Sequence, residues 1–414
     1  MKRIRESMAR KKRKKNIFQK FARLSKGKKI VIIVAIILVL TAAGVAGYVF
    51  SKLNHLDRAS MDTTKLSIVD VDGYANILLL GVDTRDMKNI KGSRSDAIMV
   101  VSINTKTQEV NLISLYRDTF LKLGDTGTYD KITHACAYGG PELSVQAINQ
   151  ALDLNISNYV VVNFKAVADL VDAVGGITVN VKDIEINQLN KYTIQTAKNI
   201  GCKDYSLVKA AGKQKLSGVQ AVSYGRIRKG VGDDYERTHR MRIVLSKVFK
   251  KMKQMPLTKL DKIADMMLPQ VQTSLSNSDI LALSVRLSSY QIMGSTGFPY
   301  SVSGGMIGGV SYVIPNDLAG DVARLHSEMF GQENYVVSPM VQTITSEIAA
   351  RVSASNVVKK EIKVPETKKT ETKKVEPKKE EPKKEEPKQE EEVKDNPPVE
   401  EIQEEGQGEE NGKN

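Results

Sequence analysis

The sequence has few of the residues that build metal–thiolate or metal–imidazole sites. Its 414 residues include two cysteines, four histidines and no tryptophan. Cys136 and Cys202 cannot form a four-ligand zinc site by themselves, and the four histidines show no metal-ligand spacing. Two thiols are enough for one disulfide in an oxidising compartment, but their spacing leaves a disulfide and free thiols equally open.

Net charge is nearly absent from the body of the chain. The formal net charge is +14, but residues 1–29 contain fourteen Lys or Arg residues and one Glu, which leaves +1 for the other 385 residues. A nucleic-acid-binding domain carries a basic patch or stripe as its electrostatic footprint. We therefore expect no nucleic-acid partner.

A long apolar run follows the basic tail directly. Residues 30–50, IVIIVAIILVLTAAGVAGYVF, include no charged residue, and as a helix they would span roughly 30 Å, the thickness of a bilayer core. A cleaved signal peptide would have a shorter apolar region and a small-residue cleavage site. Because Lys and Arg favour the cytoplasmic side, we predict a single-pass cell-membrane protein. Its tail at 1–29 is cytoplasmic, its one transmembrane helix covers 30–50, and the remainder is extracellular.

Composition divides the extracellular remainder into three parts. Residues 51–73 are interpreted as a short stalk and residues 74–346 as the folded domain. Residues 347–414 are rich in Lys, Glu and Pro, contain the repeats of EPKKEEPKKEEPKQE and include no aromatic residue. Such a segment cannot bury enough apolar surface to offset its ordering entropy, so we predict a disordered tail.

Within the folded domain, short apolar runs alternate with helical patterns. Residues 97–104 and 109–116 are predicted to form an antiparallel hairpin, because only four residues join them. The other predicted elements are strands at 76–83, 158–164 and 177–181 and helices at 141–152, 165–174, 217–228, 234–252 and 316–330. This alternation predicts an α/β domain with a mixed central sheet between layers of helices.

The hairpin brings charges of both signs to one edge of the sheet. Arg94 and Asp96 precede its first strand, and Arg117 and Asp118 follow its second. In an antiparallel pair the start of one strand lies beside the end of the other, so we expect these four side chains to meet. Asp83 joins them if its own strand runs antiparallel to residues 97–104.

Such a cluster suits a metal ion and a phosphorylated ligand. Asp83 and Asp96 fit Mg²⁺, which takes one or two carboxylates, waters and substrate phosphates, while arginine forks fit phosphate oxygens. The stretch SYGRIRKGVGDDYERTHR, residues 223–240, adds arginines near a predicted helix start, where backbone N–H groups also favour anions. These arginines are Arg226, Arg228, Arg237 and Arg240. The alternative is a set of surface Arg–Asp pairs, each contributing about 0–1 kcal/mol.

Seven motifs in this order resemble the LytR–CpsA–Psr family of cell-envelope proteins. They cover residues 76–240: NILLLGVDTRD, GSRSDAIMVVSIN, LISLYRDT, DKITHACAYGG, VDAVGGITVNV, LSGVQAVSYGRIR and GDDYERTHR. The resemblance implies an α/β sandwich with a hydrophobic tunnel for a lipid tail. It also implies a phosphotransferase that moves an anionic glycopolymer, a teichoic acid or capsular polysaccharide, from a polyprenyl-pyrophosphate carrier onto a hydroxyl of peptidoglycan.

The resemblance also implies roles for single residues. Asp83 and Asp96 take the Mg²⁺ (or Mn²⁺) role. Pyrophosphate binding falls to Arg94, Arg117, Arg226, Arg228 and Arg237, and Arg240 of the same stretch is grouped with them. The expected catalytic residues are Arg94, Arg117, Asp118 and Asp234, with either aspartate as the candidate base for the acceptor hydroxyl.

Three positions depart from the family pattern. Tyr116 replaces the usual Pro, Ala97 the usual Thr and Met241 the usual Gln, and none of these changes removes a charged ligand. Two other functions stay open: a pyrophosphatase that uses water as the acceptor, and a non-catalytic lipid–glycan binding or attenuator protein. The converging carboxylates argue against pure binding, because their negative charge would weaken pyrophosphate binding without a metal.

Overall fold

The structure of the protein is a computed structural model. It describes residues 47–48, 51–54, 56–58, 61–84, 86–87, 89–228, 231, 233–355, 357 and 360–362. The predicted cytoplasmic tail and nearly all of the predicted transmembrane helix lie outside these residues. Among the residues that are described, no helix combines the length and apolar character needed to cross a bilayer.

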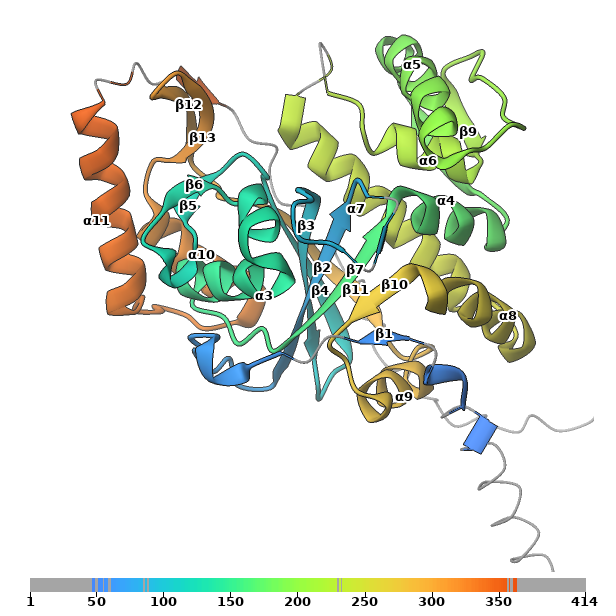
Figure 1. Cartoon of the computed structure of the whole chain (residues 1–414), viewed down its shortest axis with the longest axis horizontal. Helices are drawn as coiled ribbons and strands as arrows, with labels where there is room; N and C mark the ends of the chain where they lie inside the picture. The colour runs from blue at the N-terminus through green and yellow to red at the C-terminus, as the bar shows by residue number, and fades with distance from the viewer. Residues whose placement is uncertain are drawn as a thin grey trace, which may run out of the picture. The chain divides into compact units, whose positions relative to one another are not determined.

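A mixed sheet of seven strands forms the centre of the fold (Figure 1), with the order β1-β10-β7-β2-β3-β4-β11. The strands are β1 (Asp57–Arg58), β2 (Tyr74–Val82), β3 (Ser95–Asn104), β4 (Glu109–Leu115), β7 (Asn158–Asn163), β10 (Val271–Thr273) and β11 (Gln291–Phe298). β2, β3 and β4 are antiparallel neighbours, whereas β7 runs parallel to β2 and β11 parallel to β4. The predicted hairpin is therefore confirmed, as is the antiparallel pairing of the strand that leads to Asp83.

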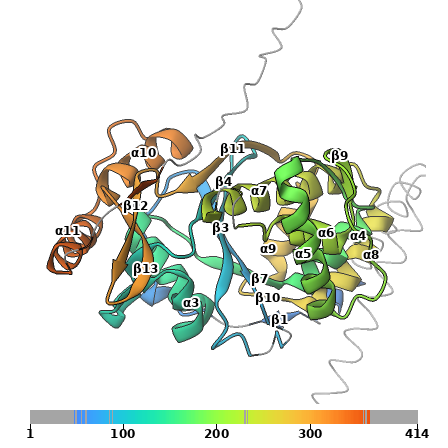
Figure 2. The same cartoon turned by 90° about the horizontal axis from the view of Figure 1, so that it is seen from above.

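Helices cover both faces of this sheet, which confirms the predicted α/β architecture. α3, α10 and α11 lie on one face, and α4, α6 and α7 lie on the other with α5 and α8 beyond them (Figures 1 and 2). The helices are α3 (Thr133–Leu152), α4 (Phe164–Ala173), α5 (Asp183–Ile200), α6 (Gly218–Tyr224), α7 (Asp233–Met252), α8 (Leu257–Met267), α9 (Asn277–Val285), α10 (Leu318–Phe330) and α11 (Pro339–Ala354).

Alternating side chains of the central strands supply two different apolar cores. Leu78 and Leu80 of β2 are buried in the core that contains α3, α10 and α11. Ile77 and Leu79 point to the other face and pack with Leu245 of α7. Because both faces are covered, the central strands are apolar almost throughout, which explains the nearly continuous apolar run of the sequence here.

Smaller sheets surround this centre. β5 (Phe120–Lys122) pairs with β6 (Tyr129–Lys131), and β8 (Ile177–Val181) pairs with β9 (Gly212–Leu216). β12 (Val302–Ile307) pairs with both β13 (Val310–Pro315) and β14 (Lys360–Ile362). Short 3-10 helices occupy Thr63–Lys65, Gly124–Thr126 and Leu268–Gln270.

α3 begins earlier than the sequence predicts. Pro141 was expected at its first position, but the helix starts at Thr133 and is kinked at Gly140, whose φ of 73° and ψ of −167° are not helical. Proline favours the first position of a helical segment, so Pro141 opens the second part of the kinked helix. The first part carries His134 to the edge of the sheet where β3 begins.

The predicted end of the domain at residue 346 is wrong. α11 continues to Ala354 and buries Ile348 and Val352 beyond that point. Its buried residues recur at three- and four-residue spacing, so the helix lays one apolar stripe on the core. β14 then pairs with β12, which makes residues up to 362 part of the fold rather than of a tail.

The predicted stalk at 51–73 is also part of the packed structure. Leu53, Leu66 and Val71 are buried, and the last two join the largest core. β1 adds a strand to the edge of the central sheet beside β10. Isolated apolar residues between polar ones gave no periodic pattern here, which is why the sequence did not indicate this packing.

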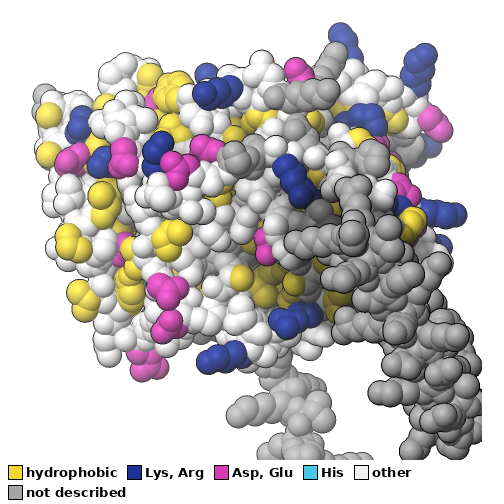
Figure 3. Space-filling model, turned by 60° about the horizontal axis from the view of Figure 1, so that its bottom comes forward, with side chains coloured by type: hydrophobic (Ala, Val, Ile, Leu, Met, Phe, Trp, Pro, Cys, Tyr) yellow, Lys and Arg dark blue, Asp and Glu magenta, His cyan; other side chains and the backbone are white. Residues whose placement is uncertain are grey.

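The face of the molecule that Figure 3 shows carries charges of both signs. Lys and Arg side chains are interspersed there with Asp, Glu and apolar side chains. That face therefore has no single-sign field of the kind that attracts a polyanion over a wide area.

Truncation tests whether α11 belongs to the core. Ending the chain after Ser346 removes Ile348 and Val352, each worth about 1.5–3 kcal/mol of burial, so we expect the melting temperature to fall by at least about 5 °C. Ending the chain after Ile362 should change it by less than about 1 °C. Differential scanning calorimetry measures both, and equal melting of the two truncated chains would show that α11 does not stabilise the fold.

Candidate functional site

A polar cavity of about 440 Å³ lies where β3 begins and β4 ends. Other contributions come from β6, the start of α3, the segment before α7 and the start of α7, the β12–β13 hairpin and β14. Its charged and ring-bearing lining residues are Arg94, Arg117, Asp118, Lys131, His134, Arg228, Asp233, Asp234, Tyr235 and Tyr312. Five of the predicted site residues, Arg94, Arg117, Asp118, Arg228 and Asp234, are thus brought together.

Strand register explains why Arg117 meets Asp96. Ile98 of β3 pairs with Leu115 of β4, so the residues two positions outside this pair lie side by side. Arg117 Nη1 donates a hydrogen bond to Asp96 Oδ1, and Arg117 Nε lies 3.7 Å from Asp118 Oδ2. Burial acts to lower the pKa of Arg117, but Asp96 and Asp118 outweigh it and raise that pKa. Arg117 is therefore a cation fixed in place at the cavity wall.

Asp118 lies among three cations. Its Oδ1 is 3.5 Å from Lys131 Nζ, and its Oδ2 is 3.6 Å from Arg228 Nη2 and 3.7 Å from Arg117 Nε. Because both oxygens already face positive charge, this carboxylate is better suited to orienting the cations than to accepting a proton from a substrate.

The start of α7 supplies a second, more buried ion pair. Arg237 Nη2 lies 2.7 Å and Arg228 Nε 3.4 Å from Asp234 Oδ1, and Arg237 and Asp234 are each 4% exposed. Burial lowers the pKa of Arg237 to about 10; Asp234 opposes this shift, whereas Arg117 and Arg228 add to it. Three neighbouring guanidinium groups are mutually repulsive, so an anion between them would be stabilising.

The charges of the cavity are almost balanced without a ligand. Five cationic side chains face four carboxylates: Arg94, Arg117, Lys131, Arg228 and Arg237 against Asp96, Asp118, Asp233 and Asp234. The net charge of this set is +1. Arg94 is exposed and makes no ion pair with any carboxylate in the described part of the chain, which leaves its guanidinium available to an anion.

The structure adds an Asp–His pair that the sequence analysis did not assign. His134 lines the polar cavity, and its Nδ1 lies 2.7 Å from Asp130 Oδ2. The hydroxyls of Tyr138 and Tyr312 donate to the same carboxylate at 2.9 and 3.1 Å. Burial acts to raise the pKa of Asp130, but these hydrogen bonds and that of the Lys131 backbone lower it. A carboxylate on Nδ1 leaves Nε2 as the nitrogen that accepts a proton.

The i, i+4 spacing of Asp130 and His134 at the start of a helix was the only signal for this pair. Histidine was considered in the sequence only as a metal ligand, and the spacing to a carboxylate was not tested. Tyr312 reaches the same carboxylate from β13, 182 residues away in sequence, so no local pattern could have indicated it.

An apolar cavity of about 180 Å³ lies between the sheet and helices α4, α6 and α7. Its lining is aliphatic and aromatic except for Asn163 and Arg226. Gly81 and Ala97 form part of its wall, and a Cβ on Gly81 would lie only 2.9 Å from that of Ala97. These two small residues leave space where larger side chains would fill the cavity. An apolar space is therefore present where the family resemblance implies a lipid tunnel.

Arg226 lines the apolar cavity rather than the polar one. Its Nη1 donates to Thr196 Oγ1 at 2.8 Å, and its guanidinium centre lies 5.0 Å from the ring of Phe164 and 5.3 Å from that of Tyr192. Arg228, two residues later, lines the polar cavity. The chain segment 226–228 therefore connects a cationic space with an apolar one.

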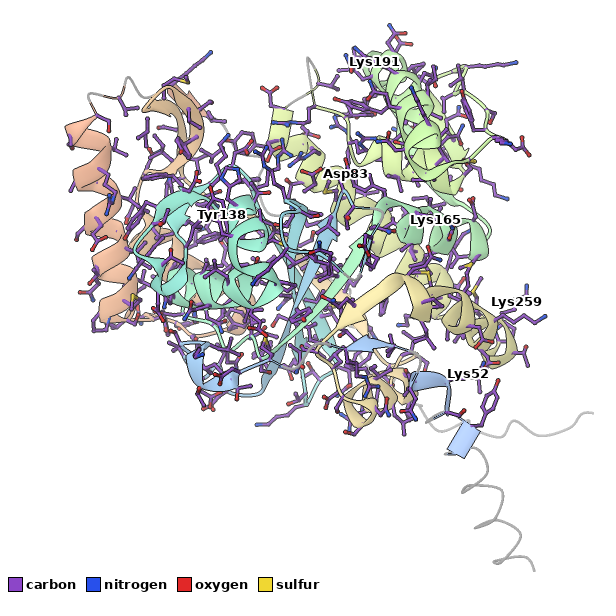
Figure 4. The ribbon with its side chains drawn as sticks, viewed as in Figure 1. Lys52, Asp83, Tyr138, Lys165, Lys191 and Lys259 are labelled. Carbon is purple, nitrogen blue, oxygen red and sulfur yellow. The ribbon has the colours of Figure 1, made fainter. Side chains whose placement is uncertain are left out.

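The two predicted metal ligands lie at neighbouring strand ends. Val82 pairs with Ser95, and a bulge leaves Asp96 outside the regular register. Asp83, at the end of β2, is exposed and lines a separate hollow with Lys165 of α4 (Figure 4). In the described part of the chain, no group of three or more metal-binding side chains is found. Two carboxylates from adjacent strands, one of them tied to Arg117, still suit Mg²⁺, which draws its other ligands from water and phosphate.

Arg240 does not belong to the phosphate-binding set, contrary to the prediction. It is 1% exposed, and its three nitrogens donate to Glu185 Oε1 at 2.8 Å, the Ile227 carbonyl at 3.1 Å and the Val231 carbonyl at 2.8 Å. Each of its three nitrogens makes a hydrogen bond inside the protein, in line with the need of a buried guanidinium for paired charge and hydrogen bonding. Arg240 thus holds the loop before α7 to the start of α5.

Comparison with known proteins identifies the family to which the chain belongs. The LytR_cpsA_psr family model matches residues 45–326. The chain is 32% identical over 302 residues to the polyisoprenyl-teichoic acid–peptidoglycan teichoic acid transferase TagT of Bacillus subtilis, covering 69% of this chain and 90% of that protein. It is 36% identical over 239 residues to the transferase TagU of Enterococcus faecalis, covering 55% of this chain and 73% of that protein.

A solved structure supports the same relation. The fold is similar to that of TagT bound to LIIa-WTA, with a TM-score of 0.50 and 26% identity, over 71% of this chain and 99% of that chain. The family match covers more than half of the chain and includes the strand ends, the polar cavity and α7. The chain therefore belongs to the LytR_cpsA_psr family.

Proposed function

We propose that the protein is a membrane-anchored phosphotransferase that moves an anionic glycopolymer from a polyprenyl-pyrophosphate carrier onto peptidoglycan. The observation that carries the proposal is that Arg228 lines a cationic cavity while Arg226, two residues earlier, lines an apolar one. A polyprenyl pyrophosphate has the complementary chemistry, an anionic diphosphate on a hydrocarbon tail. The names of the relatives, which specify transfer of teichoic acid to peptidoglycan, support the same reaction.

The diphosphate lies against Arg94, Arg117 and Arg228 in this proposal. Arg94 has an uncompensated guanidinium, and Arg117 and Arg228 are held in place by Asp118. Phosphoryl transfer depends mainly on positioning and on neutralisation of charge. Cations that are already fixed by carboxylates provide both without reorganising during the reaction.

The acceptor hydroxyl oxygen attacks the phosphorus that carries the glycan. One P–O bond forms to the acceptor, and the bond from that phosphorus to the bridging oxygen breaks, which releases polyprenyl phosphate and leaves the glycan on the acceptor as a phosphodiester. His134 Nε2 takes the hydroxyl proton, and Asp130 stabilises the resulting imidazolium. Asp118 and Asp234 act as positioning residues for the arginines.

Asp83 and Asp96 are the residues that would hold Mg²⁺ or Mn²⁺. When bound, the ion would neutralise charge on the diphosphate oxygens. The charged side chains of the polar cavity, with a net charge of +1, neutralise the diphosphate only in part. We further propose that residues 30–50 anchor the chain in the membrane with the N-terminus in the cytoplasm, which brings the extracellular site close to a lipid-linked donor.

Arg94→Ala tests the diphosphate contact. Because the substitution removes one preorganised cation that stabilises charge on the reacting diphosphate, we expect the rate of transfer to fall by roughly 10²- to 10³-fold. The full-length chain would receive Mg²⁺, a polyprenyl-pyrophosphate-linked sugar and a peptidoglycan oligosaccharide, and mass spectrometry would quantify the phosphodiester product. Lys91→Ala, an exposed cation three residues earlier, is the matched control and should transfer at the native rate.

The melting temperature of Arg94→Ala should stay within about 1 °C of the native value, since the residue is exposed and makes no ion pair with a described carboxylate. Full activity of this variant would contradict the proposal. Release of free sugar phosphate by the native protein, without the phosphodiester product, would instead identify a pyrophosphatase.

His134→Gln tests the proton acceptor. We expect transfer to fall by roughly 10²- to 10⁴-fold while lipid binding is retained. Lys91→Ala, an exposed change outside the cavity lining, serves as the control. A His134→Gln variant with the native rate would exclude this role.

A further inference from the structure

A second large groove runs along α7 and is not used by the proposed reaction. It has a volume of about 1010 Å³ and lies between α7, the start of α5 and β11. α7 contributes one stripe to it at three- and four-residue spacing: Glu236, His239, Ile243, Ser246 and Lys250. Lys253 follows just beyond the end of the helix. We call this cavity the α7 groove. The stripe covers 14 residue steps, or about 21 Å of helix, so the groove suits an extended chain better than a single small ion.

A buried arginine lines this groove, and two of its nitrogens lack hydrogen-bond partners in the described part of the chain. Arg242 is 7% exposed, and its Nε and Nη1 have no hydrogen-bond partner among the described residues. Burial lowers the pKa of Arg242 to about 10, and Tyr116 and Glu236 offset only part of that effect. A buried guanidinium is normally paired or fully hydrogen-bonded, as Arg240 is. Arg242 therefore has the properties of a site that an anion completes.

The other charges of the α7 groove favour the same kind of ligand. Lys182 and Lys250 line it with exposed side chains, and Lys253 lines it while donating a hydrogen bond to the Tyr290 carbonyl. Of the two carboxylates in the lining, Glu185 is neutralised by Arg240 at 2.8 Å. Glu236 remains, so cations exceed uncompensated carboxylates along the groove.

The α7 groove begins next to the polar cavity. Glu236 lines the groove, and Tyr235 and Asp234, one and two residues earlier on the same helix, line the polar cavity. Tyr116, which directly precedes Arg117, is among the side chains that influence Arg242 electrostatically. A chain that leaves the polar cavity at this point can continue along the helix.

We propose that the α7 groove binds the phosphodiester units of an anionic glycan chain, with Arg242 as the buried anchor and Lys250 as a contact at the rim. This inference rests on the proposed function, because it assigns to the groove the part of the donor that follows the transferred phosphate. A groove of this kind would retain polymeric donors in preference to a single lipid-linked sugar.

Binding of a soluble polymer tests the groove separately from transfer. A fluorescently labelled poly(glycerol phosphate) oligomer would be titrated into the full-length chain in detergent, and anisotropy would give its affinity. We expect Arg242→Met to weaken binding about 10-fold or more, since a charged hydrogen-bonding anchor is lost, and Lys250→Gln to weaken it roughly threefold. Lys247→Gln, an exposed change on the same helix but outside the groove lining, should bind as the native chain does.

Two further arms separate this inference from the proposed function. Arg94→Ala should keep native affinity for the oligomer, because Arg94 belongs to the polar cavity; loss of binding in that variant would place the polymer there and overturn the inference. A carboxylate polymer of equal length, polygalacturonate, should bind at least about 10-fold more weakly. Equal affinity for both polymers would show non-specific polyanion binding instead. Native affinity in both Arg242→Met and Lys250→Gln would likewise contradict the α7 groove, whether or not the protein transfers glycans.

The stability of Arg242→Met controls for misfolding. A buried charge without a partner is costly to the fold, so replacing it with methionine should leave the melting temperature unchanged or raise it. The oligomer should raise the melting temperature of the native chain and have a smaller effect on this variant. If Arg242→Met fails to fold, the oligomer affinities of the exposed variants Lys250→Gln and Lys247→Gln still decide the outcome.

Discussion

The antiparallel register of β2, β3 and β4 is the constraint on which the rest of the site depends. It places the end of β4 beside the start of β3, so that Arg117 meets Asp96 and the charged residues before and after the hairpin share one cavity. The same strands are buried on both faces by α3, α10 and α11 and by α7. Their apolar packing holds this edge rigid, and rigid placement of cations is what a phosphoryl-transfer site requires.

Charge is arranged in pairs in this protein, and the exceptions carry the functional argument. Arg240 with Glu185, and Arg117 with Asp96, are pairs that the fold completes by itself. Arg94 is exposed without an ion pair to a described carboxylate, and Arg242 has buried nitrogens without hydrogen-bond partners among the described residues. Arg237 is paired with Asp234 but is also crowded by Arg117 and Arg228. Because like charges repel and buried charge is costly, these three arginines are where anions add most stability.

Sequence reasoning succeeded where structure is local and failed where it is not. The hairpin, the order of strands and helices and the cluster of Arg94, Arg117 and Asp118 follow from short turns and alternation, which are properties of neighbouring residues. Arg240 was wrongly assigned to phosphate binding because its spacing on a helix does not show that Glu185, 55 residues away, pairs with its guanidinium. The packed segment before β2 was missed because its apolar residues are isolated and only the assembled core shows what they contact. The end of α11 was missed although its buried residues recur at three- and four-residue spacing, because the prediction for residues 347–414 followed their overall composition.

The central claim is that one lipid pyrophosphate occupies the polar and the apolar cavity together. A crystal structure of the protein with a polyprenyl pyrophosphate and Mg²⁺ tests it most directly. Our account predicts phosphate oxygens beside Arg94, Arg117 and Arg228, and the hydrocarbon tail between the sheet and helices α4, α6 and α7. A lipid bound elsewhere, with Arg117 and Arg228 still paired only to their aspartates, would contradict it.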